Sequence, residues 1–77
     1  MENEQIEALV ESRLEGAKAT VTGDGRHFEI TVVCDQFAGK SLLQRHRLVL
    51  DTVQAEIASD QLHALSISST KTPQEVA

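Results

Sequence analysis

Two short segments in which apolar and polar residues alternate flank the tripeptide Gly23-Asp24-Gly25. Glycines on both sides of an aspartate are a strong turn signal, and alternation with a period of two is the pattern of a strand with one buried face. The segments Ala17–Thr22 and His27–Cys34 therefore predict an antiparallel hairpin. Its buried face is predicted to carry Ala19 and Val21 from the first strand, then Phe28, Ile30, Val32 and Cys34 from the second.

Two segments with helical periodicity are candidates to cover that face. The first follows a predicted cap at Asn3 and ends at Gly16, and its apolar stripe consists of Ile6, Leu9, Val10 and Leu14. The second follows a cap at Ser41 and stops near Ser59-Asp60, and its stripe consists of Leu42, His46, Val49, Leu50, Val53 and Ile57. Because His46 lies on this stripe, it is predicted to be a packed, hydrogen-bonded core histidine.

The remaining residues predict a third strand followed by a short C-terminal helical segment. Leu62–Ser68 is read as a strand, with His63, Leu65 and Ile67 on one face. Thr72–Glu75 forms a capping box with proline at the first helical position, although few residues follow it. Residues 70–77 are therefore predicted to be a frayed or truncated last helix. The element order is α–β–β–α–β–(α), which predicts one two-layer α+β domain over residues 1–77.

Length, charge and cysteine content narrow the classes of function. A chain of 77 residues supports one core and no deep cleft. Its net charge of −5 argues against bulk electrostatic binding to nucleic acid or to an anionic membrane. The apolar runs are too short to span a bilayer. The single cysteine cannot form an internal disulfide, and together with the polar N-terminus it predicts a reducing, cytoplasmic setting.

The residues that could carry chemistry are few. The chain contains no phosphate-binding loop, no nucleophile elbow and no paired CxxC, so we do not expect an enzyme. Cys34 lies on the buried face of its strand, where a thiol is more often a small hydrophobic side chain. His27 and His63 stand at strand ends, and their spacing of 36 positions is not by itself a specific metal signal.

Three segments together carry a family resemblance. Phe37–Val49 follows the pattern F-x-G-K-x-x-x-x-R-H-R-x-V, which resembles the signature of the BolA family. Leu62–Ile67 resembles that family's "HAL" third strand, and Thr72–Glu75 resembles its following T-P-x-E. The turn Gly23–Phe28 looks closest to the bacterial acid-stress subgroup called IbaG or YrbA. The resemblance covers nearly the whole chain.

The resemblance implies a fold similar to a type II KH domain and a non-enzymatic function. Family members pair with monothiol glutaredoxins and share or transfer a 2Fe–2S cluster in iron–sulfur and iron homeostasis and in stress response. The family's cluster ligand on the HAL strand corresponds to His63. The second ligand, from the loop between the first two strands, corresponds most closely to His27. Histidine is an accepted ligand in 2Fe–2S centres, and the glutaredoxin cysteine and glutathione would supply the remaining ligands.

The resemblance also implies an alternative, a DNA-binding transcriptional regulator. In that case Lys40, Arg45 and Arg47, the basic residues of an acid-free segment, would contact phosphates. The net charge and the presence of only two aromatic residues weigh against it, and Phe37–Lys40 is not the GxxG loop of a KH domain. A glutaredoxin is therefore the favoured partner. A weak homodimer is left open, and no membrane partner is expected.

Overall fold

The predicted hairpin forms the centre of the molecule. In a computed structural model, which describes all 77 residues, strands β1 (Lys18–Gly23) and β2 (His27–Val33) pair in antiparallel register, with Val21 opposite Ile30. All six residues predicted for the inner face are buried. The outer face carries mainly threonine, serine and glutamate and is largely exposed, as its polar composition requires.

Strand β3 (Ala64–Lys71) completes a three-stranded sheet in the order β1-β2-β3 and runs parallel to β2. Its register slips by one residue at Ser68, which is a bulge. The strand extends beyond the predicted end at Ser68, so Thr70 and Lys71 belong to β3 and not to the predicted last helix. These residues are held because their backbone groups join the β2 ladder, as in the 2.9 Å bond from the amide of Cys34 to the carbonyl of Lys71.

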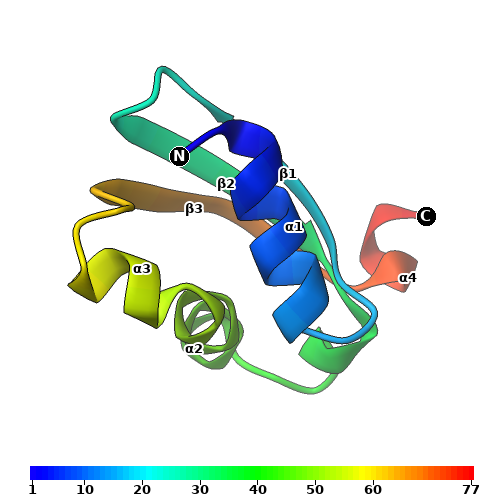
Figure 1. The fold of residues 1–77 in the computed structure, drawn as a ribbon. Helices are drawn as coiled ribbons and strands as arrows, with labels where there is room; N and C mark the ends of the chain where they lie inside the picture. Colours follow the sequence, from blue (N-terminus) through cyan, green and yellow to red (C-terminus); the bar gives the residue numbers. More distant parts are fainter.

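Helix α1 (Asn3–Arg13) lies alongside the free edge of β1 (Figure 1). Its N-cap is Glu2 rather than the predicted Asn3, because Glu2 and Gln5 form a reciprocal capping box. Two glutamates one turn apart reach the strand. Glu7 accepts a 2.8 Å hydrogen bond from the amide of Val21, and Glu11 accepts one of 2.9 Å from the amide of Ala19.

The second predicted helix is divided into α2 (Leu42–Thr52) and α3 (Gln54–Ala58) by a break at Val53, where φ is −121° and ψ is 18°. The hydroxyl of Thr52 donates to the carbonyl of Val49, a local bond that competes with regular helix geometry. The carbonyl of Thr52 accepts a 2.7 Å hydrogen bond from Arg13 of α1. The carbonyl of Thr52 is therefore hydrogen-bonded although the helix is broken after it.

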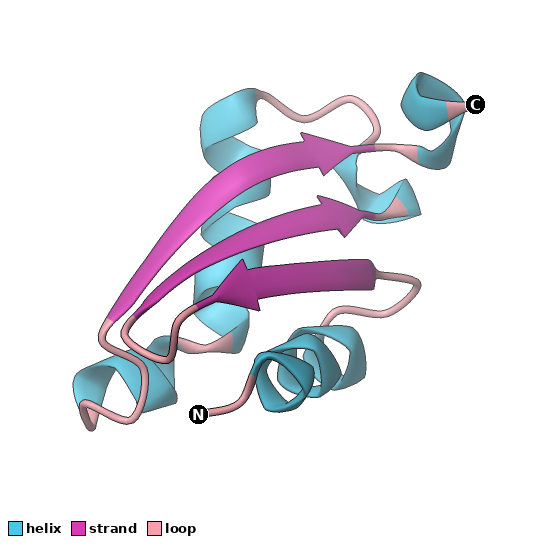
Figure 2. Ribbon diagram, turned by 90° about the horizontal axis from the view of Figure 1, so that it is seen from above, coloured by secondary structure: helices cyan, strands magenta, loops and turns pink.

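The start of α2 confirms the predicted cap at Ser41, whose side chain accepts from the amide of Gln44. The stripe on α2 differs from prediction. Val49 and Val53 are fully buried, but Leu42 is 65% exposed. His46 is only partly buried, so its prediction as a core residue was wrong. The reason is the narrow sheet: α2 crosses beneath the strands, and its first turn extends past the edge of β3 (Figure 2).

The chain ends in the predicted capping box, which forms a single turn, α4 (Pro73–Val76). The core between sheet and helices is one cluster of 13 buried apolar residues, including Phe37 from the short 3-10 helix η1 (Asp35–Phe37). None of the helices has both the length and the apolar composition needed to cross a lipid bilayer.

Candidate functional site

The fold brings His27 and His63 together although they are far apart in the sequence. His27 is the first residue of β2, and its partner in the parallel ladder is Ala64, the residue after His63. Paired strands lie about 4.8 Å apart and consecutive Cα atoms 3.8 Å apart, so the two histidine Cα atoms are no more than about 9 Å apart. Both residues are exposed. The two imidazoles therefore lie at the same end of the sheet, where β2 and β3 begin.

The turn before His27 is braced by Asp24. Its carboxylate accepts hydrogen bonds from the amides of Arg26 at 2.9 Å and of His27 at 3.0 Å. The His27 amide bond is the main reason why the pKa of Asp24 lies below its ordinary value of 3.8. Both glycines of the turn are required for different reasons: a Cβ on Gly23 would collide with the carbonyl oxygen of His27, and Gly25 has a φ of +99°, which other residues rarely adopt. His27 therefore belongs to a held strand end rather than to a loose loop.

The backbone of His63 is held by the residue that precedes it. The preceding residue, Leu62, is buried, and its amide donates a 3.1 Å hydrogen bond to the carbonyl of Glu56 in α3. The turn between α3 and this point passes through Asp60, which has a φ of 63°. Because Leu62 is anchored and Ala64 begins β3, the backbone of His63 is fixed while its side chain reaches solvent. A side chain whose backbone is fixed and whose ring reaches solvent is preorganised for contact with another molecule.

The two histidines do not by themselves complete a metal site. No group of three or more histidine, cysteine, aspartate or glutamate side chains in the chain is arranged to hold a metal ion. A 2Fe–2S cluster takes four ligands, of which two can be histidines. The residues present therefore fit a cluster only if a second molecule supplies the remaining ligands. Their exposure at one end of the sheet leaves room for such a molecule.

Cys34 does not belong to this site. It follows the last residue of β2 and lies seven residues from His27, which corresponds to about 23 Å along a strand. The thiol is fully buried, and its Sγ donates to the carbonyl of Glu15 at 3.4 Å. This agrees with the interpretation of Cys34 as a small core residue.

The three basic residues of the DNA alternative are not equivalent. Arg45 is a structural residue whose guanidinium donates to the carbonyls of Lys40 and Thr70 and to the carboxylate of Glu75. It also lies over the ring of Phe37, 5.8 Å from the centroid. Lys40 and Arg47 remain exposed and line an open hollow of about 190 Å³, which Asp51 also lines.

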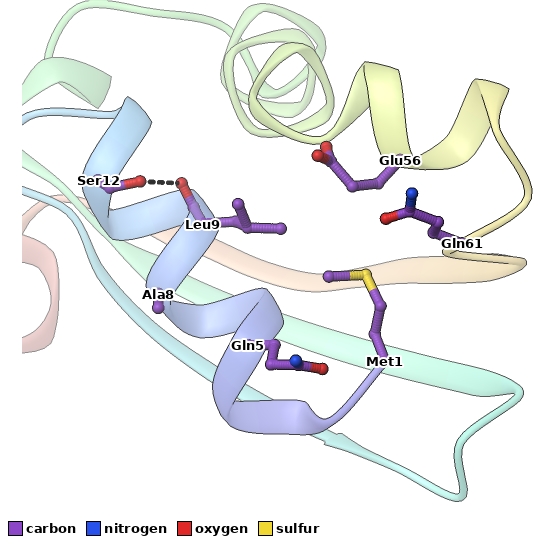
Figure 3. A pocket seen from close by; sticks show the side chains of 7 residues that line it. All are labelled: Met1, Gln5, Ala8, Leu9, Ser12, Glu56 and Gln61. Carbon is purple, nitrogen blue, oxygen red and sulfur yellow. Dashed lines mark hydrogen bonds between the residues drawn. The ribbon is translucent and has the colours of Figure 1, made fainter.

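The largest pocket, of about 510 Å³, lies elsewhere, between α1 and α3 (Figure 3). Two of its polar groups are already hydrogen-bonded or paired. The hydroxyl of Ser12 donates to the carbonyl of Leu9, and Glu56 pairs with Arg13 at 2.9 Å, which lowers the pKa of Glu56. None of the residues predicted to be functional lines this pocket. It contains no pair of groups suited to acid–base or nucleophilic chemistry.

Sequence reasoning missed two polar interactions, of which only the first lies at the site. One is the Asp24 brace, which the spacing of an aspartate two residues before Arg26 could have indicated as an Asx turn. The other is the ion pair of Arg45 with Glu75, which joins residues 30 positions apart. Nothing in the local pattern indicates that pairing.

Comparisons with known proteins agree with this architecture. A family model described as "BolA-like protein" matches residues 1–75. Protein BOLA2 of Arabidopsis thaliana is 42% identical over 76 residues, which cover 94% of this chain and 80% of the relative. Acid stress protein IbaG of Escherichia coli K12 is 34% identical over 77 residues, covering 100% and 90% respectively.

A solved structure extends the likeness to three dimensions. The bolA protein homologue from Coxiella burnetii superposes with a TM-score of 0.89 at 38% sequence identity, covering 99% of this chain and 96% of the other. The family match over nearly the full length, the relatives above 30% identity and the shared fold all point to one conclusion. The chain belongs to the BolA-like protein family.

Proposed function

We propose that this protein is a partner of a monothiol glutaredoxin, with which it shares or transfers a 2Fe–2S cluster through His63 and His27. The observation that supports this most directly is the ladder pairing of His27 with Ala64, which brings two exposed imidazoles to one end of the sheet. Two histidines are an incomplete ligand set, so the function lies in the complex rather than in the isolated chain. The glutaredoxin cysteine and glutathione would complete the set.

The roles of the two histidines follow from how each is held. His63 follows a buried anchor at Leu62, so its imidazole is positioned by the core. The residue before His27 is exposed, so His27 is held by the Asp24 turn and by its ladder position in β2, without a buried anchor beside it. His63 is therefore the principal ligand and His27 the supporting one. When the cluster is bound, its iron can accept or give up an electron, while the chain's own residues hold and orient it.

The decisive experiment is anaerobic reconstitution of the chain with a monothiol glutaredoxin and glutathione, followed by visible absorption and circular dichroism. We expect the His63→Ala variant to lose the spectrum of the mixed-ligand complex and to keep the far-ultraviolet spectrum of the folded domain. His46→Ala is the matched control, because it removes a partly buried histidine that lies on α2.

Binding without the cluster separates docking from ligation. The apo complex, measured by calorimetry, should form with both variants if a wider surface supplies the contact. An unaltered cluster spectrum in the His63→Ala complex would disprove the ligand assignment. Failure of the unmodified chain to bind the glutaredoxin would disprove the partnership itself.

The nucleic-acid alternative has less support. Of its three basic residues, Arg45 has a structural role, and the hollow that Lys40 and Arg47 line also contains Asp51. Binding through the two remaining cations would be weak and steeply dependent on salt.

A further inference from the structure

The two edges of the sheet differ in whether their outward backbone groups are hydrogen-bonded. At the β1 edge, the outward amides of Ala19 and Val21 are both bound by glutamate carboxylates of α1. An unprotected edge strand exposes a row of backbone donors and acceptors to which another strand can add. α1 therefore closes the β1 edge. The edge of β3 has no comparable cover (Figure 2).

The register identifies the free groups on β3. Because the amide of Val21 points away from β2, its ladder partner Ile30 bonds toward β3. In a parallel ladder, a residue bonds to the residues before and after its partner, not to the partner itself. Ile30 therefore bonds to the neighbours of Ile67, and the backbone groups of Ile67 face outward. The same reasoning applies to Leu65, the partner of Phe28. No loop, helix or side chain donates to or accepts from Leu65 or Ile67.

Only the far end of this edge is closed. The outward carbonyl of Thr70 accepts a 2.9 Å hydrogen bond from Arg45. The bulge at Ser68 separates this end from the free part. No charged residue occurs from Ala64 to Thr70, although charges are a common means of keeping other strands from an edge.

Beneath the open edge, α2 continues an apolar stripe past the sheet. Val49 and Val53 are fully buried where strands cover them. His46, one turn earlier than Val49, is half-buried, and Leu42, a further turn out, is 65% exposed. Arg45 reaches the outward carbonyl of Thr70, which places this part of α2 at the β3 edge, three residues along the strand from Ile67. Leu42 and His46 thus form an apolar surface, the floor, on which a further strand beside β3 could pack; the chain itself contains no such strand.

We propose that the β3 edge and the Leu42–His46 stripe form a groove that binds an extended polypeptide segment of a partner protein as a fourth strand. Leu65 and Ile67 would provide the backbone hydrogen bonds. Side chains on one face of the incoming strand would pack on Leu42 and His46, so that face must be apolar. This groove is distinct from the two histidines, and the proposal does not depend on the cluster.

The chemistry of the groove selects its occupant. Its strand is uncharged and its floor is leucine and histidine, so it suits alternating apolar and small polar side chains. The first turn of α2 extends past the edge of β3 (Figure 2). A second copy pairing edge to edge would have to fit its own α2 into the same space. A single-stranded nucleic acid would find no aromatic platform there, because both phenylalanines are buried in the core. A short extended peptide avoids both conflicts.

The test uses the cluster-free chain without glutaredoxin, and its probe is a synthetic, end-blocked peptide with the sequence of Ala64–Thr70. This probe alternates apolar and serine residues over Leu65–Ser68, and it lacks the α2 helix that a whole second copy would bring. Nitrogen-15 NMR should show the amides of Leu65 and Ile67 shifting on addition of the peptide, and their hydrogen exchange should slow. The same peptide with proline in place of its isoleucine is the control probe, because it lacks one backbone donor.

Matched variants test the floor. Leu42→Glu should weaken peptide binding about tenfold, because it puts a charge under the added strand. Leu43→Glu should leave binding within about twofold, since Leu43 lies roughly 100° farther round the helix, away from the stripe. The proposal is overturned if the β3 amides do not respond or if both variants weaken binding equally. It is also overturned if an oligothymidylate, and not the peptide, shifts those amides.

Discussion

Arg45 joins the start of α2 to the one-turn helix at the end of the chain, because its Nη1 lies 2.8 Å from Oε1 of Glu75. The same nitrogen donates to the carbonyl of Thr70 at 2.9 Å. Glu75 in turn accepts a 2.7 Å hydrogen bond from the amide of Thr72. One guanidinium therefore holds α4 against the domain and closes one end of the β3 edge. A single-turn helix could not persist through its own backbone bonds.

Stability should depend on acidity through Glu75. Its bond to Arg45 is the main reason why the pKa of Glu75 is lowered from 4.5 to about 2. The folded state therefore favours the ionised form, and this contribution is fully present above pH 4.5. It should be lost as the pH falls from 4.5 towards 2. Urea unfolding of the natural chain and of Glu75→Gln, measured across this range, should show a stability difference that shrinks with acidification. A difference independent of pH would contradict the pairing.

A buried hydroxyl offers a stabilising substitution. Thr70 is 3% exposed, and its Oγ1 has no hydrogen-bond partner. Thr70→Val replaces that hydroxyl with a methyl group of similar size and should raise the free energy of unfolding by about 1 kcal/mol. For a domain of this size the melting temperature should rise by roughly 4–8 °C. Thr20→Val, at an exposed strand position, is the control and should change stability by less than about 0.5 kcal/mol. A destabilised Thr70→Val variant would show that the hydroxyl is paired in solution.

The difference between His46 and Val49 can be measured directly. His46 is partly buried at the sheet edge, so His46→Asp should cost less than about 1.5 kcal/mol. Val49 is fully buried one turn later, so Val49→Asp should cost on the order of 3 kcal/mol or more. Thermal unfolding of the two variants under identical conditions tests this ranking. Equal losses would place His46 in the core.

The glutamates of α1 should protect the β1 edge. Glu7→Ala removes a charge-assisted bond to the amide of Val21 and should cost about 1 kcal/mol. Glu15→Ala is the control, because the Glu15 side chain makes no hydrogen bond, and it should cost less than about 0.5 kcal/mol. The double variant with Glu11→Ala should associate with rising concentration in analytical ultracentrifugation, because its edge is open. A double variant that stays monomeric would show that α1 shields the edge by its position alone.

The supporting role of His27 predicts a graded effect. In the reconstituted glutaredoxin complex, His27→Ala should shift or weaken the cluster spectrum without abolishing it, because water or another side chain can replace an exposed ligand. Asp24→Ala leaves the imidazole in place but removes the bonds that brace its backbone, and it should reproduce part of that change. Complete loss of the cluster in His27→Ala, with an unchanged spectrum in His63→Ala, would reverse the proposed roles.

Local patterns in the sequence were sufficient for the order of the elements and for most of their positions, although they missed the break at Val53 and the end of β3. Alternation around Gly23–Gly25 determined the hairpin and its buried face, and the caps at Ser41 and Thr72 were correctly located, because each depends on residues within three or four positions. The family resemblance, confirmed by the comparisons, rests on equally local motifs.

Only the tertiary structure decided which residues of those elements are covered and which meet. The stripe on α2 is continuous in sequence, but burial ends at Leu42 because the sheet is only three strands wide. Arg45 and Glu75 pair across 30 positions, and His27 lies beside His63 only because β2 and β3 run parallel in one register. Such contacts depend on the relative placement of separate elements. That placement is set by packing of the shared core, which no single segment encodes.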